Sequence, residues 1–259
     1  MTLALEVKGL NKAFGALAVA RDVDLALAPG ARHALIGPNG AGKTTFVGMV
    51  SGLIRADSGT ISLHGEDVTH LAAEQRTKRG LVRTFQVSSL FEKLTVLENV
   101  YLAASEHSGA SLRLWRAAGK DKQTIERAAA IIERLRLTDD IHHRVSDIAY
   151  GRQRLVEIAI ALALEPTVLL LDEPAAGIPS SEVGVLMDAV QTLPSHIAIL
   201  IIEHDMQVVR RLAKEITVLV GGAVLIRGTP SEVMSSDEVK RVYLGAAGTK
   251  RFKAGSIHA

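Results

Sequence analysis

The sequence predicts an α/β fold built around buried parallel strands. The chain has 259 residues, 47% of them apolar, which is enough for one domain with a substantial core. Short apolar runs bounded by Gly, Pro or charged residues recur along it, and several of them are apolar on both faces. Between Val168 and Val220 these runs alternate with helical patterns, which is the order of elements expected in an α/β protein.

The apolar runs predict strands because each is short and ends at Gly, Pro or a charged residue. They cover residues 3–7, 23–27, 33–36, 61–63, 81–85, 168–171, 197–202 and 216–220. The first belongs to a segment, residues 1–14, in which apolar residues alternate with Glu6, Lys8 and Lys12. This alternation predicts a strand. The segment also lacks the uninterrupted apolar run of a secretory signal.

The stretch from about residue 87 to residue 150 is predicted to be a helical insertion. Thr95 and Glu98 fit a capping box at the start of a helix. Residues 125–137 carry an amphipathic stripe, which consists of Ile125, Ala128, Ala129, Ile132 and Leu135. Because this periodicity is helical, the segment is expected to interrupt the α/β core.

A late helix is predicted to begin at Thr229. Its hydroxyl can cap the helix, Pro230 suits the first turn, and Glu232 suits the third position. Residues 245–259 show no periodicity and are expected to form a flexible C-terminal tail. The predicted organisation is therefore a single domain over residues 1–244, with the helical insertion at residues 87–150.

Composition argues against several classes of protein. The 30 Lys and Arg residues against 28 Asp and Glu give a net charge of +2, so the whole-chain charge gives no reason to expect nucleic acid as a partner. The chain has no cysteine, which removes disulfides and thiolate metal sites and agrees with a reducing compartment. The most apolar stretch, residues 155–171, is interrupted by charge and proline, whereas a membrane span needs about 20 apolar residues.

A phosphate-binding loop pattern follows the predicted strand that ends at Ile36. Its glycines let successive backbone N–H groups wrap phosphate oxygens, and the helix that starts near Lys43 directs its positive end at them. Lys43 would reach the β and γ phosphates and Thr44 would bind Mg²⁺. The candidate nucleotide ligands are Gly37, Pro38, Asn39, Gly40, Ala41, Gly42, Lys43, Thr44 and Thr45.

Polar side chains follow three other predicted strands. Asp172 and Glu173 end the apolar run at residues 168–171, in the manner of a Walker B strand. Asp172 would hold Mg²⁺ through water, and Glu173 could polarise an attacking water as general base. A solvated acidic turn is the alternative for this pair. His204 and Gln86 likewise follow strands, at the edge where open α/β sheets bind ligands, although each could simply be a polar strand terminus.

Taken in chain order, these motifs resemble an ABC ATPase. The order is the phosphate loop, Gln86, the segment at residues 148–154, the Walker B strand and His204. More narrowly, residues 83–86, 94–100, 172–177, 202–206 and 243–245 look like the ATPases of branched-chain amino acid importers. The resemblance covers essentially the whole chain. It implies a P-loop NTPase core of the ABC-ATPase type, with an N-terminal antiparallel β subdomain and an inserted helical subdomain.

The resemblance also implies an ATP molecule held between two cassettes, with Mg²⁺ as the metal. The phosphate loop of one subunit would face the signature segment of the other, here Ala149, Tyr150, Gly151 and Arg152. Phe14 would stack on adenine, with a core position as its alternative. The implied catalytic residues are Glu173 as general base, His204 on the γ phosphate and Gln86; the implied metal ligands are Thr44, Gln86 and Asp172.

Three residues depart from the family pattern. Ala149 stands where ABC proteins generally have a serine hydroxyl, although the branched-chain subfamily often has alanine there. Arg152 stands where glutamine is usual, and its cation could partly replace the missing hydroxyl or could be a solvated charge. Pro179 stands where the family tends to have Asn or Asp. These departures concern the contact between the two cassettes.

The resulting hypothesis is an ATPase that energises an importer of branched-chain amino acids or a similar small amphipathic solute. Its implied partners are a second ABC ATPase subunit, two membrane permeases and a periplasmic solute-binding protein. The implied location is cytoplasmic, at the inner face of the membrane. The alternatives are a weakly hydrolysing structural cassette in a heterodimer, a cassette for urea, amide or aromatic acid uptake, and a soluble ABC ATPase. The last would need a coiled-coil insertion or a second cassette, which this length does not hold.

Overall fold

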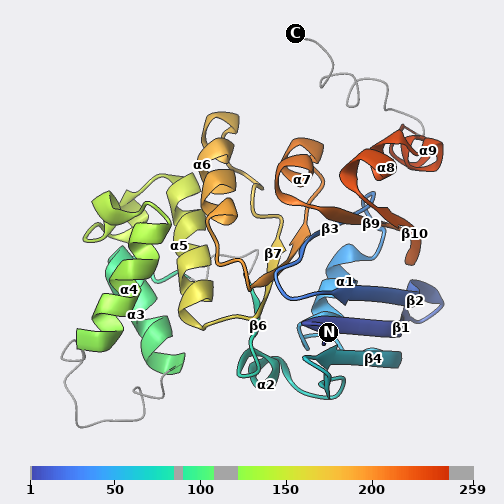
Figure 1. Cartoon of the computed structure of the whole chain (residues 1–259), viewed down its shortest axis with the longest axis horizontal. Helices are drawn as coiled ribbons and strands as arrows, with labels where there is room; N and C mark the ends of the chain where they lie inside the picture. Colours follow the sequence, from blue (N-terminus) through green and yellow to red (C-terminus); the bar gives the residue numbers. More distant parts are fainter. Residues whose placement is uncertain (1, 85–89, 108–121, 245–259) are drawn as a thin grey trace.

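The computed structural model describes residues 2–84, 90–107 and 122–244, which form two β-sheets and surrounding helices (Figure 1). The larger sheet has six strands in the order β10-β9-β3-β8-β7-β6. These are β3 (Arg32–Ile36), β6 (Leu81–Arg83), β7 (Val168–Asp172), β8 (Ala198–Ile202), β9 (Glu215–Val220) and β10 (Ala223–Gly228). All of them pair in parallel except β10, which is antiparallel to β9.

The smaller sheet is antiparallel and lies on the N-terminal side of the chain. Its order is β2-β1-β4-β5, built from β1 (Leu5–Phe14), β2 (Leu17–Leu27), β4 (Ser58–Leu63) and β5 (Glu66–Asp67). Helix α1 (Lys43–Val50) lies between the two sheets, because one buried cluster contains Phe46 and Met49 of α1, Leu10 and Ile61 of the small sheet, and Leu200 of the large one. The antiparallel N-terminal β subdomain is therefore confirmed.

Helices cover the other face of the large sheet. They are α5 (Tyr150–Ala163) and α6 (Ser180–Gln191), while α3 (Val96–His107) and α4 (Lys122–Arg134) pack against α5; all four share one apolar cluster with inward residues of β7 and β8. Figure 1 shows α3 and α4 at the end of the molecule away from the small sheet. The short helix α2 (Ala73–Thr77) follows β5.

The last helices pack against the β9 side of the large sheet. Helices α7 (Met206–Leu212), α8 (Pro230–Ser235) and α9 (Asp237–Leu244) form a third apolar cluster with β3 and β9. Helix α8 starts with the capping box predicted for Thr229 and Glu232, and Pro230 occupies its first turn. Within the described residues, no helix is both long enough and apolar enough to cross a membrane.

The α/β fold is confirmed, and each predicted strand overlaps a strand of the structure. The capping box of Thr95 and Glu98 is present, with the Glu98 N–H donating to Thr95 Oγ1 at 3.1 Å. Ala128 and Ile132 are fully buried, as the stripe predicted. Strand β10 was missed, because its burial does not alternate and its antiparallel pairing follows from the Gly221-Gly222 turn. The domain boundary at residue 244 stays a prediction, and residues 245–259 lie outside the described residues.

Candidate functional site

The phosphate loop joins β3 to α1, and its backbone admits only glycine at two positions. A Cβ on Gly37 would lie 2.2 Å from the Leu219 carbonyl oxygen, and one on Gly42 would lie 2.2 Å from that of Val19. Gly42 also adopts a φ of 98°, in the left-handed region. It precedes Lys43, the first residue of α1, and no side chain caps this helix. The N-terminal amides of α1 are therefore available to a phosphate group.

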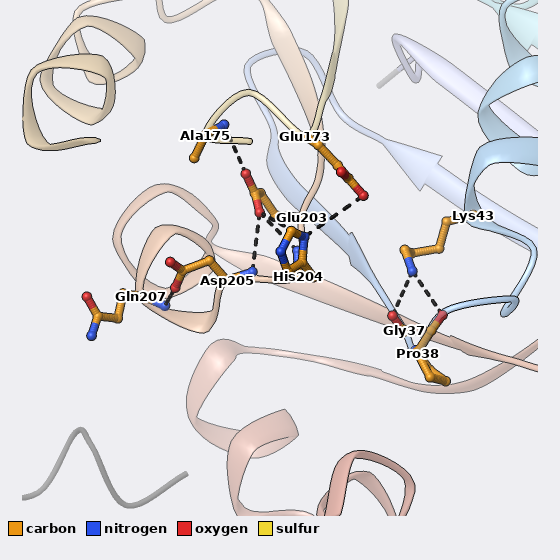
Figure 2. A network of polar contacts seen from close by, with 9 residues as sticks. All are labelled: Gly37, Pro38, Lys43, Glu173, Ala175, Glu203, His204, Asp205 and Gln207. Carbon is orange, nitrogen blue, oxygen red and sulfur yellow. Dashed lines mark hydrogen bonds and ion pairs between the residues drawn. The ribbon is translucent and has the colours of Figure 1, made fainter. Parts of the chain in front are cut away.

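Lys43 folds back onto its own loop. Its Nζ donates to the Gly37 carbonyl oxygen at 2.7 Å and to that of Pro38 at 3.0 Å (Figure 2). Burial lowers the pKa of Lys43, and the nearby carboxylates of Glu173 and Asp172 oppose that shift. The ammonium thus lies close to the two Walker B acids, although the phosphate loop and the Walker B strand are far apart in the sequence.

Asp172 and Glu173 lie at the carboxyl end of β7, and their environments differ. The Asp172 carboxylate is buried and paired with the Arg83 guanidinium, which comes from the end of β6. Glu173 is partly exposed and has a φ of 46°, a left-handed value that is uncommon outside glycine. Its backbone N–H donates to the Ile202 carbonyl oxygen at 2.9 Å. Such backbone strain costs on the order of 1 kcal/mol and is typical of functional positions.

His204 lies opposite Glu173, at the end of the neighbouring strand β8. Its Nδ1 is 3.9 Å from Glu173 Oε1 and 3.8 Å from Glu203 Oε2. Figure 2 shows the imidazole and the Glu173 carboxylate directed toward each other on the side where the phosphate loop begins. The structure therefore brings the predicted base, histidine and loop together.

Glu203 was not assigned a role from the sequence. Its side chain is 1% exposed and accepts three backbone N–H groups: those of Ala175 at 3.1 Å, His204 at 3.0 Å and Asp205 at 3.2 Å. Burial raises its pKa, and the three N–H groups oppose that effect. Glu203 thus ties the loop after Glu173 to the loop that carries His204. A carboxylate placed directly after an apolar strand was the signal that could have revealed it.

The signature segment begins α5, and its side chains have partners within the chain. The Tyr150 hydroxyl accepts a hydrogen bond from Arg154 Nη2 at 2.6 Å, and Tyr150 stays 40% exposed. The Arg152 guanidinium pairs with Asp140, and its Nη2 donates to the Arg136 carbonyl oxygen at 2.8 Å. This arrangement favours a structural role for Arg152. Contacts of Ala149, Tyr150, Gly151 and Arg152 with a second cassette stay predictions.

Gly151 and Pro179 lie at the facing starts of α5 and α6. A Cβ on Gly151 would lie 2.4 Å from the Glu182 carboxylate, so this close approach requires glycine unless Glu182 moves. Pro179 is the residue that precedes α6. Pro179 is therefore the N-cap of the helix that faces the signature segment.

The predicted nucleotide contacts of two further residues, Phe14 and Gln86, stay predictions. Phe14 ends β1 and is 53% exposed, with the Lys12 ammonium 5.3 Å from the ring centroid. The alternative of a core position is therefore wrong, while adenine stacking stays a prediction. Gln86 lies outside the described residues, so its predicted contacts stay predictions as well.

The oxygen donors near the loop suit Mg²⁺. Thr44 follows Lys43 and is exposed, and the Asp172 carboxylate lies close enough to influence the pKa of Lys43. Hydroxyl and carboxylate oxygens are the hard ligands that Mg²⁺ takes alongside phosphate oxygens. To hold Mg²⁺ through water, Asp172 would have to share its carboxylate with Arg83 or release that partner.

Comparison with known proteins identifies the family. A family model described as ABC transporter matches residues 20–176. The chain belongs to the ABC transporter family. This cassette is 37% identical over 252 residues to the high-affinity branched-chain amino acid transport ATP-binding protein LivG of Escherichia coli, with 94% of this chain and 98% of LivG covered. BraF of Pseudomonas aeruginosa, which has the same description, is 35% identical over 250 residues, with 94% and 98% covered.

Solved structures agree with that assignment. An ATP-binding cassette of an ABC transporter in its ADP conformation superposes with a TM-score of 0.84 at 28% identity, over 95% of this chain and 99% of that one. A nucleotide-free ATP-binding cassette gives a TM-score of 0.82 at 28% identity, over 94% and 99%. The predicted resemblance and the ABC-ATPase fold are thus confirmed.

Proposed function

We propose that this cassette binds and hydrolyses ATP to energise an importer of branched-chain amino acids or a similar small amphipathic solute. The observation that carries the proposal is the proximity of Glu173 and His204, at the ends of neighbouring strands, to Lys43 at the start of α1, with Glu173 held in a strained backbone conformation. The descriptions of LivG and BraF as branched-chain amino acid transport proteins support the solute class.

Each residue of the centre has a distinct task in this proposal. Lys43 leaves the Gly37 and Pro38 carbonyls and binds the β and γ phosphates, while the open N-terminus of α1 supplies backbone N–H groups. Thr44 and Asp172, with the predicted contribution of Gln86, hold Mg²⁺, which neutralises charge on the phosphates. Phe14 stacks on the adenine.

The water-activating step belongs to Glu173. Its partly exposed carboxylate can accept a proton from a water molecule placed against the γ phosphate, whereas Asp172 is held in its pair with Arg83. His204, 3.9 Å from Glu173, donates to the γ phosphate and keeps the carboxylate oriented. Because His204 follows the strand between β3, which leads into the phosphate loop, and β7, which carries Glu173, removal of the imidazole should affect turnover more than nucleotide affinity.

Two substitutions test these roles. Lys43→Ala should abolish ATP binding, measured by equilibrium titration. Glu173→Gln should bind ATP normally and hydrolyse it slower by orders of magnitude, since it removes a group that acts only in the transition state. Glu74→Gln, an exposed carboxylate on α2, is the matched control and should keep the parent turnover. Near-normal turnover in Glu173→Gln would reject Glu173 as the base and favour His204.

A weakly hydrolysing structural cassette is the second candidate. The absence of a hydroxyl at Ala149 and the presence of Pro179 at the facing loop favour it. Turnover of the parent with its partner subunits separates the two functions. A parent that binds ATP and shows turnover no faster than its Glu173→Gln variant would establish the structural cassette.

The proposed assembly places the cassette at the cytoplasmic face of the membrane. It would pair with a second ABC ATPase subunit, itself or a related chain, and attach to two permeases fed by a periplasmic solute-binding protein. Phe91, which is 60% exposed beside the start of α3, is our choice of anchor for a permease helix. Ligand screening of a solute-binding protein from a neighbouring reading frame would distinguish branched-chain amino acids from urea, amides and aromatic acids.

A further inference from the structure

The C-terminal helix α9 packs onto the strand that leads into the phosphate loop. Val239 of α9 is fully buried in a cluster that also contains Ala34 and Ile36 of β3, and Tyr243 packs against the same cluster. Ile36 is the residue directly before Gly37, the first residue of the loop. The ring of Tyr243 is thereby held near the carboxyl end of β3, although 206 positions separate Tyr243 from Gly37 along the chain.

The hydroxyl of Tyr243 is buried and makes no hydrogen bond within the described part of the chain. Tyr243 packs on the cluster that contains Ile36, the residue directly before Gly37. Burial raises the pKa of Tyr243, and the backbone N–H of Gly37 opposes that shift. A buried hydroxyl without a partner destabilises the fold, and a phenylalanine would fill the same space without that cost. The retained hydroxyl therefore requires an explanation beyond packing.

The hydrogen bonds of Lys43 show why the phosphate loop would need another stabilising contact when nucleotide binds. In the structure its Nζ binds the carbonyl oxygens of Gly37 and Pro38, which fixes the beginning of the loop. When Lys43 turns to the phosphates of a bound nucleotide, both of these hydrogen bonds are lost. The Gly37 N–H lies on the preceding peptide and does not depend on Lys43.

We propose that Tyr243 is a positioning residue for the phosphate loop, whose hydroxyl accepts a hydrogen bond from the Gly37 N–H when nucleotide is bound. A hydrogen bond from α9 thus replaces part of the stabilisation that the loop loses when Lys43 leaves the Gly37 and Pro38 carbonyl oxygens. This inference rests on the proposed nucleotide binding and deepens it, since it makes α9 a determinant of nucleotide affinity. A shift of α9 away from β3 would weaken nucleotide binding in the same way.

The test separates the hydroxyl from the packing of the ring. Tyr243→Phe removes only the oxygen, and Val239→Ala removes buried apolar atoms from the same helix and cluster. For each variant we would measure the dissociation constant for ADP with Mg²⁺ by fluorescence titration, and the Tm without nucleotide. Tyr243→Phe should have a Tm equal to or above that of the parent and an ADP affinity lower by about two- to tenfold, the range of one ordinary hydrogen bond.

Val239→Ala should give the opposite pattern, a lower Tm with near-parent ADP affinity of the folded protein, because it removes buried apolar atoms and leaves the Tyr243 hydroxyl in place. Parent affinity in Tyr243→Phe overturns the inference. A Tm loss without nucleotide in Tyr243→Phe also overturns it, since the hydroxyl would then serve the fold itself. A parent that binds no nucleotide refutes the proposed function and this inference together, whereas binding by the parent and by Tyr243→Phe alike refutes only this inference.

Discussion

Substitution of Glu203 by Gln tests whether one buried carboxylate holds both catalytic loops. Oε1 of Glu203 accepts the Ala175 N–H, while Oε2 accepts those of His204 and Asp205. A glutamine has one acceptor oxygen, so its NH₂ group must face at least one of these N–H groups. The less damaging orientation keeps His204 and Asp205 bonded and leaves the Ala175 N–H without an acceptor.

The structure sets the size and the pH dependence of the effect. One buried N–H without an acceptor costs about 1–3 kcal/mol. Removal of a buried charge offsets part of this cost, and the offset depends on pH. Because burial raises the folded pKa of Glu203 above its ordinary value of 4.5, the parent loses stability as the pH rises from about 4.5 through the folded pKa. The stability difference between parent and Glu203→Gln should therefore be largest below pH 4.5 and shrink at higher pH.

Urea unfolding at several pH values and ATPase turnover measure the two consequences. Glu203→Gln should also lower kcat more than it changes the nucleotide dissociation constant, because the loops after Glu173 and around His204 lose their common acceptor. Glu232→Gln removes an exposed capping carboxylate of α8 and is the control that reduces stability without reaching these loops. A Glu203→Gln variant with parent stability and parent kcat would refute this reasoning.

Three other outcomes follow from single side chains. Burial lowers the pKa of His33 from 6.5 to about 4. The free energy of unfolding should therefore keep the whole His33 contribution above pH 6.5 and lose about 3 kcal/mol as the pH falls from 6.5 through 4. Urea unfolding of His33→Asn at several pH values should lack this loss. Arg152→Gln should lower the Tm by breaking the pair with Asp140, and weakened ATP-driven association with an unchanged Tm would instead place Arg152 at the opposite nucleotide. Because Phe91 is exposed, Phe91→Ala should change the free energy of unfolding by no more than about 0.5 kcal/mol while reducing co-purification with permeases. A Tm drop of several degrees with normal permease binding would contradict the role of Phe91 as an anchor.

The phosphate loop and the Walker B strand could be predicted because their chemistry is local. Gly37 and Gly42 leave no room for a Cβ, so the glycine spacing itself encodes the loop. The acids at residues 172 and 173 follow an apolar run, and parallel strands deliver such residues to one edge of a sheet. Nothing beyond short-range pattern was needed for these motifs.

Other features depend on contacts between distant positions. The pairing of Arg152 with Asp140 and the approach of Tyr243 to Gly37 need the folded packing of α5 and α9, which no local pattern encodes. The exposure of Phe14 could not be read from the sequence either, because an aromatic residue at the end of a strand usually buries. Strand β10 was missed because its pairing depends on the Gly221-Gly222 turn rather than on alternation.

The strand order explains why His204 lies between the loop and the base. In the large sheet β8 separates β3, which carries the phosphate loop, from β7, which carries Glu173. All three strands are parallel, so their carboxyl ends meet at one edge and their register is fixed by a buried ladder. Glu203 comes directly after the middle strand, and its single carboxylate reaches the backbone on both the β7 loop and the β8 loop. Its substitution should therefore disturb Glu173 and His204 together, whereas substitutions in the signature segment should leave their mutual distance unchanged.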